Sequence, residues 1–221
     1  RGWVPLFQAH GRRVVRSVYT YLGASTSASF ERVGFHEDPV IVDNNADNAD
    51  GPGGTYLEHD TTSSSSNTTS VVAGTNSGIH FSFQPDLSIS MRAPATITSI
   101  RQWYGLFSST PAASNDPAVH GMGFRFSTSA PDTNIMCWCN DGSGAGTITD
   151  SGVLFVADAE YDLRMISDAD SIDYYINDQF VAHHTANLPG ASTNIKYGLY
   201  CRTLTSGVRS LRWGRITLET S

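Results

Sequence analysis

Short runs in which apolar and polar residues alternate recur along most of this chain, and they constrain its fold more than any other feature. Two clear cases are "YDLRMIS" (161–167) and "SIDYYIN" (171–177). A period of two puts alternate side chains on opposite faces of a β-strand. No apolar period of 3.6 residues persists over three turns, and turn signals fall about every 8 to 12 residues. The pattern predicts an all-β fold, a jelly-roll sandwich of two antiparallel sheets.

The segment from residue 171 to 190 is a predicted hairpin. A strand over 171–176 enters a turn at Asn177 and Asp178, both of which tolerate positive φ, and a strand over 179–184 leaves it. Further strands are predicted from "IHFSFQP" (79–85), from two runs divided at Pro94 within 89–107, and from later segments. These later segments cover 121–129, 134–140, 195–203 and 208–219. The stretches 43–54 and 60–70 are predicted to be polar loops.

The first 30 residues differ from the rest, because their charge is all basic and no acid precedes Glu31. We therefore divide the chain into an N-terminal arm or anchor, 1–30, and a sandwich domain, 31–221. "RRVVRSVYTYLG" (12–23) fits an arm that docks on an acidic partner surface, and it equally fits an ordinary edge strand whose arginines face water. The anchoring candidates are Arg1, Arg12, Arg13 and Arg16.

Charge and hydropathy exclude two kinds of partner. The net charge is −7 and lysine occurs once, at Lys196, so a general nucleic-acid binder is not expected. No apolar run approaches the length of about 20 residues that spans a bilayer, so no membrane partner is expected.

The loop "DNNADNADG" offers the best candidate metal ligands. Their alternating oxygen donors would suit Ca²⁺. An EF-hand loop needs Gly and Glu where this chain has Asn48 and Gly54. A solvated loop with no cofactor is therefore the first interpretation, and calcium is the alternative. The candidate ligands are Asp43, Asn45, Asp47 and Asp50.

The histidines and acids do not form a recognisable catalytic pattern. Adjacent His183 and His184 point to opposite faces of a strand, so they cannot chelate one metal together. Asp158, Glu160 and Asp162 are interpreted as solvated acids at the start of a strand. The chain is therefore predicted not to be an enzyme.

The three cysteines leave two alternatives open. Cys137 and Cys139 share one face of a strand and point in parallel, which is poor geometry for a mutual disulfide. One of them would pair with Cys201 if their strands are neighbours, and otherwise all three are buried free thiols.

The order of several motifs resembles a known family. A "YDLRMI" strand (161–166), a "YYIND" hairpin (174–178) and an "ANLP" exit (186–189) follow one another, with "IRQWYGLFSS" (100–109) upstream and "SLRWGRITLE" (210–219) closing the set. Together they resemble concanavalin A-like lectin/glucanase domains, above all those of bacteriophage virion proteins such as tail fibres, receptor-binding proteins and capsid decorations. The likeness spans roughly residues 80 to 220, and Asp178 stands where this hairpin usually has Gly.

The resemblance implies a concanavalin A-like sandwich with one concave sheet. Glucanases of this fold carry a Glu-x-Asp-x-x-Glu pattern on one strand, which this sequence lacks. Sugar binding needs outward aromatic rings, and Trp138 faces outward if the neighbouring cysteines face the core. The same argument selects Tyr175 and one member of the Trp103–Tyr104 pair. The candidate glycan-binding residues are Trp138, Tyr175, Trp103 and Tyr104.

We therefore expect a non-enzymatic structural protein on the surface of a bacteriophage virion, displayed on capsid or tail and attached to other virion proteins through its N-terminal arm. A homo-oligomer is expected, and the analogy with fibres and decorations suggests a trimer. The alternative is a lectin-like module that recognises a host-surface glycan.

Overall fold

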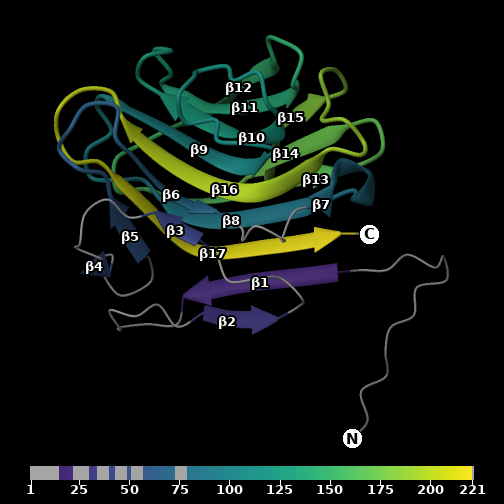
Figure 1. The fold of residues 1–221 in the computed structure, drawn as a ribbon, viewed down its shortest axis with the longest axis horizontal. Helices are drawn as coiled ribbons and strands as arrows, with labels where there is room; N and C mark the ends of the chain where they lie inside the picture. Colours follow the sequence, from purple (N-terminus) through teal and green to yellow (C-terminus); the bar gives the residue numbers. More distant parts are fainter. Residues whose placement is uncertain are drawn as a thin grey trace, which may run out of the picture.

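The computed structural model describes residues 15–21, 30–33, 40–42, 49–50, 57–72 and 79–220. It shows two antiparallel β-sheets packed face to face, as Figure 1 illustrates. Both sheets bow in the same sense. The outer face of the upper sheet in Figure 1, called sheet B below, lies on the inside of the curve. The predicted all-β sandwich is confirmed.

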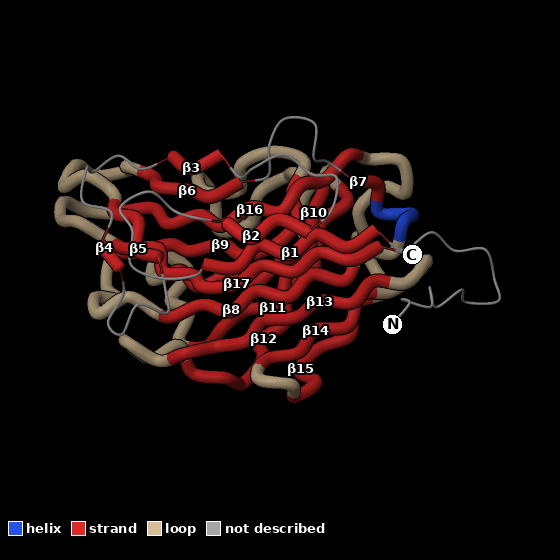
Figure 2. Tube along the Cα trace, turned by 90° about the horizontal axis from the view of Figure 1, so that it is seen from below, coloured by secondary structure: helices blue, strands red, loops and turns tan. Residues whose placement is uncertain are grey.

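Sheet A contains nine strands, and all its pairings are antiparallel. Figure 2, which views the molecule from below, shows the main strands of sheet A running side by side. The order is β15 (Gln179–His184), β14 (Ile172–Ile176), β13 (Glu160–Ser167), β8 (Asp86–Arg92), β17 (Ser210–Thr220), β1 (Val15–Tyr21) and β2 (Phe30–Val33), with β5 (Leu57–Asp60) beside β17 and β4 (Ala49–Asp50) beside β5.

Sheet B contains eight strands and covers the other side of the core. Its order is β12 (Thr147–Leu154), β11 (Asn134–Asp141), β10 (His120–Ser127), β9 (Ile100–Phe107), β16 (Asn194–Thr203), β6 (Thr68–Val72) and β3 (Val40–Val42), with β7 (Ile79–His80) beside β16.

The main core lies between the sheets and is built from alternate residues of each strand. Tyr174 of sheet A meets Phe124 of sheet B edge to face, with 5.5 Å between ring centroids. The Tyr174 hydroxyl donates to the Trp138 carbonyl across the core at 2.8 Å. A buried hydroxyl needs such a partner, while each fully buried large apolar side chain contributes about 1.5–3 kcal/mol.

Most predicted strands are present, including the two that flank Pro94 and the hairpin at Asn177 and Asp178. Both turn residues have positive φ, 51° and 61°. The strand predicted over 79–85 is wrong beyond its first two residues. Phe81–Phe83 forms a 3-10 turn (η1), because the chain must leave sheet B at β7 and enter sheet A at β8.

The loop predicted over 60–70 is shorter in the structure. β5 ends at Asp60 and β6 begins at Thr68, so only 61–67 connects them. Thr69 and Ser70 are buried where β6 pairs with β16. Polar composition therefore concealed a strand that the tertiary pairing stabilises.

The segment 12–23 contributes β1, which pairs with β17 on one side and β2 on the other. Arg16 is the register partner of Glu219 in this pairing. The other anchoring candidates, Arg1, Arg12 and Arg13, lie outside the described residues. The division of the chain at residue 30 stays a prediction.

The part of the chain that the structure describes contains no helix of the length and apolarity that a bilayer-spanning segment requires.

Candidate functional site

An open groove of about 390 Å³ lies on the outer face of sheet A. It runs across three neighbouring strands, β13, β8 and β17, and reaches the hairpin turn between β14 and β15. A hollow of this size is within the range of small-ligand sites. Its lining consists of Asp86, Ser88, Ile89, Ser90, Asp162, Leu163, Arg164, Asp178, Arg215, Thr217 and Glu219.

Short side chains on the central strand create the hollow. Ser88 and Ser90 alternate with buried residues of β8, so both point to the outer face. In register, Ser88 stands between Arg164 and Thr217, and Ser90 stands between Asp162 and Arg215. Two serines flanked by longer polar side chains leave space above the middle of the sheet.

An ion pair closes one side of the groove. Arg164 donates from Nε to Asp86 Oδ1 at 3.0 Å and from Nη2 to Oδ2 at 2.5 Å. The hydrogen bonds that Arg164 donates to Asp86 raise the pKa of Arg164. This bidentate pair fixes a charged, planar wall, although its solvent exposure limits what it contributes to stability.

Asp162 forms part of the opposite side and is fixed by its neighbours. Its Oδ1 accepts the Ser90 hydroxyl at 2.6 Å. Its backbone is tied to Asn177 twice, since Asp162 N donates to Asn177 Oδ1 at 2.9 Å and Asn177 N donates to Asp162 O at 2.8 Å. These bonds hold the β14–β15 turn against β13 and so bring Asp178 to the groove.

The third strand supplies a cation and an anion. Arg215 is exposed and donates from Nε to Thr217 Oγ1 at 3.1 Å. Glu219 is the register partner of Asp86 on the neighbouring strand. The groove therefore offers hydroxyl, carboxylate and guanidinium groups together, which can both donate and accept hydrogen bonds.

Two aromatic rings stand beside the groove on β14 and β15. Tyr175 is the register partner of Arg164 on one side and of Phe180 on the other. The Tyr175 and Phe180 rings meet edge to face, with centroids 5.8 Å apart. Phe180 is 58 % exposed and Tyr175 is half-buried. Exposed aromatic surface next to a polar hollow is a typical binding feature.

Of the four predicted glycan-binding residues, only Tyr175 lies beside this groove. Tyr104 is buried in the main core, where its hydroxyl donates to Gln102. Trp103 and Trp138 point to the outer face of sheet B, as their alternation predicts, but both are 0 % exposed. Stacking of a sugar on Trp138, Trp103 or Tyr104 is therefore not available in this structure, because other side chains and a loop cover the rings.

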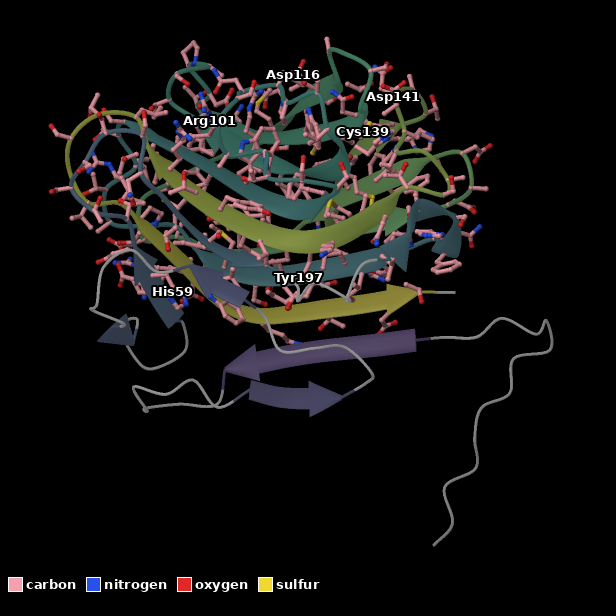
Figure 3. All side chains as sticks on the ribbon, in the orientation of Figure 1. His59, Arg101, Asp116, Cys139, Asp141 and Tyr197 are labelled. Atoms are coloured by element: carbon pink, nitrogen blue, oxygen red, sulfur yellow. The ribbon has the colours of Figure 1, made fainter. Side chains whose placement is uncertain are left out.

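The cover on sheet B is the loop between β9 and β10, residues 108–119. Asp116 of this loop accepts the Trp138 indole N–H at 3.0 Å and the Gly146 amide at 3.0 Å. Arg101 donates from Nε to Asn115 at 2.7 Å. Figure 3 shows Arg101 and Asp116 on the side of sheet B that faces away from sheet A. The inside of the curve is thus filled by the chain itself.

The acidic run 158–162 divides between two places. Asp158 accepts a hydrogen bond from Arg212 at 2.6 Å and sits in a turn with φ 59°. Glu160 is exposed, and Asp162 lines the groove. The first two match the solvated acids expected from sequence, while the position of Asp162 in a hollow was not expected.

The histidines behave as their alternation predicts. His183 is exposed and pairs with Asp173 at 2.6 Å, whereas His184 is 2 % exposed. Burial lowers the pKa of His184 to about 4, with a smaller contribution from His183. The His184 ring binds Thr149 of sheet B, so it holds structure together.

The cysteines are free thiols, all of them buried. Cys137 and Cys139 lie on β11 and Cys201 lies on β16, and two strands, β10 and β9, separate these in sheet B. The disulfide alternative is therefore wrong.

The predicted calcium ligands Asp43, Asn45 and Asp47 lie outside the described residues, and only the backbone of Asp50 is described, in β4. The calcium site stays a prediction. Within the described side chains, no group of three or more His, Cys, Asp or Glu residues is arranged to hold a metal ion.

Comparison with known proteins supports the fold. No family model matches the sequence, and no curated protein does. Among solved structures, the Crh5 transglycosylase matches with a TM-score of 0.61 and 13 % identity over 94 % of this chain and 85 % of that one. The β-glucanase of Bacillus licheniformis matches at 0.52 and 13 % over 74 % and 78 %. The Emp47p carbohydrate recognition domain matches at 0.54 and 8 % over 76 % and 89 %.

These neighbours have the lectin/glucanase fold expected from the sequence resemblance, and the chain shares that fold. They contradict the prediction that the protein is not an enzyme, because a glucanase and a transglycosylase are built on the same sandwich. The prediction rested on the lack of a recognisable catalytic pattern among the histidines and acids, and the missing Glu-x-Asp-x-x-Glu pattern tests only one arrangement of carboxylates. The low identities mean that the likeness itself shows the fold alone.

Proposed function

We propose that this protein binds carbohydrate in the groove on the outer face of sheet A. The observation that carries the proposal is the polar hollow with Tyr175 and Phe180 beside it. A sugar presents hydroxyls, which need donors and acceptors, and an apolar ring face, which packs on aromatic carbon. The occurrence of this fold in a carbohydrate recognition domain and in a glucanase supports a carbohydrate ligand.

A glycan array followed by titration with the bound oligosaccharide tests this proposal. Tyr175→Ala should weaken binding by about tenfold or more, since it removes the half-buried ring that adjoins Arg164. Ser88→Tyr should abolish binding, because a large side chain would fill the middle of the groove. Both positions face solvent, so the variants are expected to fold.

Phe83→Ala is the matched control, because Phe83 is an exposed aromatic (47 %) outside the groove lining. It should bind like the wild type. If no glycan on the array binds, or if Ser88→Tyr and the wild type bind equally, the groove is not the site. Bound polymers should also be assayed for new reducing ends, because the groove contains several carboxylates and glycoside hydrolysis requires a pair.

A second proposal concerns where the domain works. We propose that it is displayed on the surface of a bacteriophage virion, attached through its N-terminal segment to other virion proteins and assembled as a homo-oligomer, with a trimer expected. The support is the motif order in residues 100–219 and the arginine-rich start. Copy number in purified particles tests it: hundreds of copies indicate capsid decoration, and a handful indicate the tail.

The structure changes how the anchor is tested. Removing residues 1–30 would delete β1, which pairs with β17 and β2. A truncation that ends at residue 14 leaves this strand in place and still removes Arg1, Arg12 and Arg13. Full loading of that truncated protein onto particles would argue against the arm as anchor.

A further inference from the structure

The charges around the groove are unequal. Its lining includes four carboxylates and two guanidinium groups, a formal charge of −2. The Arg164 guanidinium is engaged by both oxygens of Asp86, so this pair is neutral as a unit. Glu219 also acts on Arg164 through its charge. Asp162 and Asp178 then face one guanidinium, that of Arg215. The described part of the groove is therefore an anionic site.

Asp162 lies on β13 and Asp178 lies in the β14–β15 turn, which is bound to Asp162 through Asn177. Asp162 is fixed by Ser90, and its backbone bonds to Asn177 hold the turn that carries Asp178. Asp178 follows Asn177 directly and is exposed. Phe180 and Tyr175 are on the strands that leave and enter the same turn. A sugar stacked on these rings would thus place its substituents close to carboxylate oxygens.

From this arrangement we infer that the groove selects glycans that carry ammonium groups, namely amino sugars without an N-acetyl group, over uronate- or sialate-bearing glycans. The inference rests on the proposed carbohydrate-binding function. An ammonium group supplies three donors to carboxylate acceptors, and charge-assisted bonds of this kind are stronger than neutral ones. A sugar carboxylate would instead meet like charge, which is unfavourable in a partly enclosed site.

The test compares three oligosaccharides of equal length by calorimetry: glucosamine oligomers, their N-acetylated counterparts and oligogalacturonate. The glucosamine oligomer should bind about tenfold tighter than the N-acetylated one, with an advantage that shrinks as salt screens the charges. Oligogalacturonate should bind most weakly. Asp162→Asn and Asp178→Asn should each reduce the glucosamine affinity by about three- to fivefold and reduce the N-acetylated affinity by less.

These variants are chosen to keep the fold. An Asn at 162 still accepts the Ser90 hydroxyl, and an Asn at 178 tolerates the positive φ of 61°. Asp170→Asn is the control, because Asp170 is an exposed carboxylate outside the groove lining. It should change no affinity.

The outcomes separate the inference from the proposed function. Equal affinity for glucosamine and N-acetylglucosamine oligomers, or preference for oligogalacturonate, overturns the charge selection and leaves carbohydrate binding intact. A glucosamine preference that Asp170→Asn weakens as much as Asp162→Asn also overturns it, because the attraction would then be diffuse. If none of the three oligosaccharides binds and no glycan on the array binds, both the charge selection and the carbohydrate-binding proposal are overturned.

Discussion

His184 joins the two sheets at one open edge of the sandwich, and this makes stability depend on pH. His184 lies on β15, the edge strand of sheet A, and Thr149 lies on β12, the edge strand of sheet B. His184 Nε2 and Thr149 Oγ1 are 2.9 Å apart, and the imidazole packs 4.8 Å from the Tyr174 ring. The site suits a neutral imidazole, because burial disfavours the charged form.

The size of the effect follows from the pKa of His184, which falls from 6.5 to about 4 on folding. As the pH drops, the unfolded chain binds the proton first, so the folded state loses stability. The contribution is fully present above about pH 6.5 and is lost progressively down to about pH 4. It amounts to about 3 kcal/mol in all, and about 2 kcal/mol is already lost at about pH 5.

The perturbation is His184→Gln, which keeps an amide donor near Thr149 and removes the titration. Urea unfolding, followed by the fluorescence of the buried tryptophans, gives the free energy of unfolding between about pH 7.5 and about pH 5. The wild type should lose about 2 kcal/mol more than the variant across this interval.

His183→Gln is the control, since it removes the exposed neighbour that pairs with Asp173 and leaves His184 buried. It should follow the wild type in its pH dependence. If the wild type and His184→Gln lose stability in parallel, the burial of a neutral His184 does not govern the acid response, and the argument fails.

Three further predictions concern the scaffold. Asp132→Asn should destabilise the fold by about 3 to 5 kcal/mol, measured by urea unfolding, because it leaves the guanidinium of Arg125 buried without its bidentate partner. Replacing both members with apolar residues should cost less than Asp132→Asn alone. Gly105→Ala should lower the free energy of unfolding by about 3 kcal/mol or more in the same assay, because the new Cβ would lie 2.6 Å from the Gly123 Cα. Unchanged stability would contradict this close approach. The cysteine thiols should react with a thiol reagent only after unfolding, because burial removes access and raises each pKa, and rapid labelling of the native protein would contradict their burial.

Alternation predicted the strands of sheet A well, because inward and outward residues alternate along β8, β13 and β14. "YDLRMIS" was interpreted through its inward residues, and the same period places Asp162 and Arg164 on the outer face. The signal for part of the groove was therefore present in a segment already recognised as a strand. The sequence pattern did not give the strand order, and Ser88 and Arg164 become neighbours only when β8 and β13 pair.

The aromatic candidates failed for a different reason. Alternation correctly placed Trp138 on the face opposite Cys137, but a face that points away from one core is not necessarily in water. Residues 108–119 carry no periodic pattern, and their place over Trp138 depends on bonds such as that from the indole to Asp116, 22 positions away. Local sequence rules cannot supply contacts at that separation.

The missed strand β12 shows the limit of polarity as a signal. Its sequence, "TITDSGVL", is half-exposed along its length because it lies at the edge of sheet B, and Gly152 adopts a positive φ of 72°. An edge strand needs only one buried face and one paired side, so its composition resembles that of a loop.

The contrast between the two outer faces explains why a binding site is expected on one of them. On sheet B, glycines at 105, 123 and 198 stand in register and leave room for the rings of Trp103, Trp138 and their neighbours, which the loop then covers. On sheet A, the central strand carries serines instead, and large groups stand on either side of them. Small residues thus admit the protein's own aromatics on one face and leave a polar hollow on the other. A ligand that enters the hollow displaces water alone. A ligand that reached the tryptophans would first have to break the hydrogen bonds that Trp138 and Gly146 donate to Asp116. This difference in free-energy cost favours the groove of sheet A.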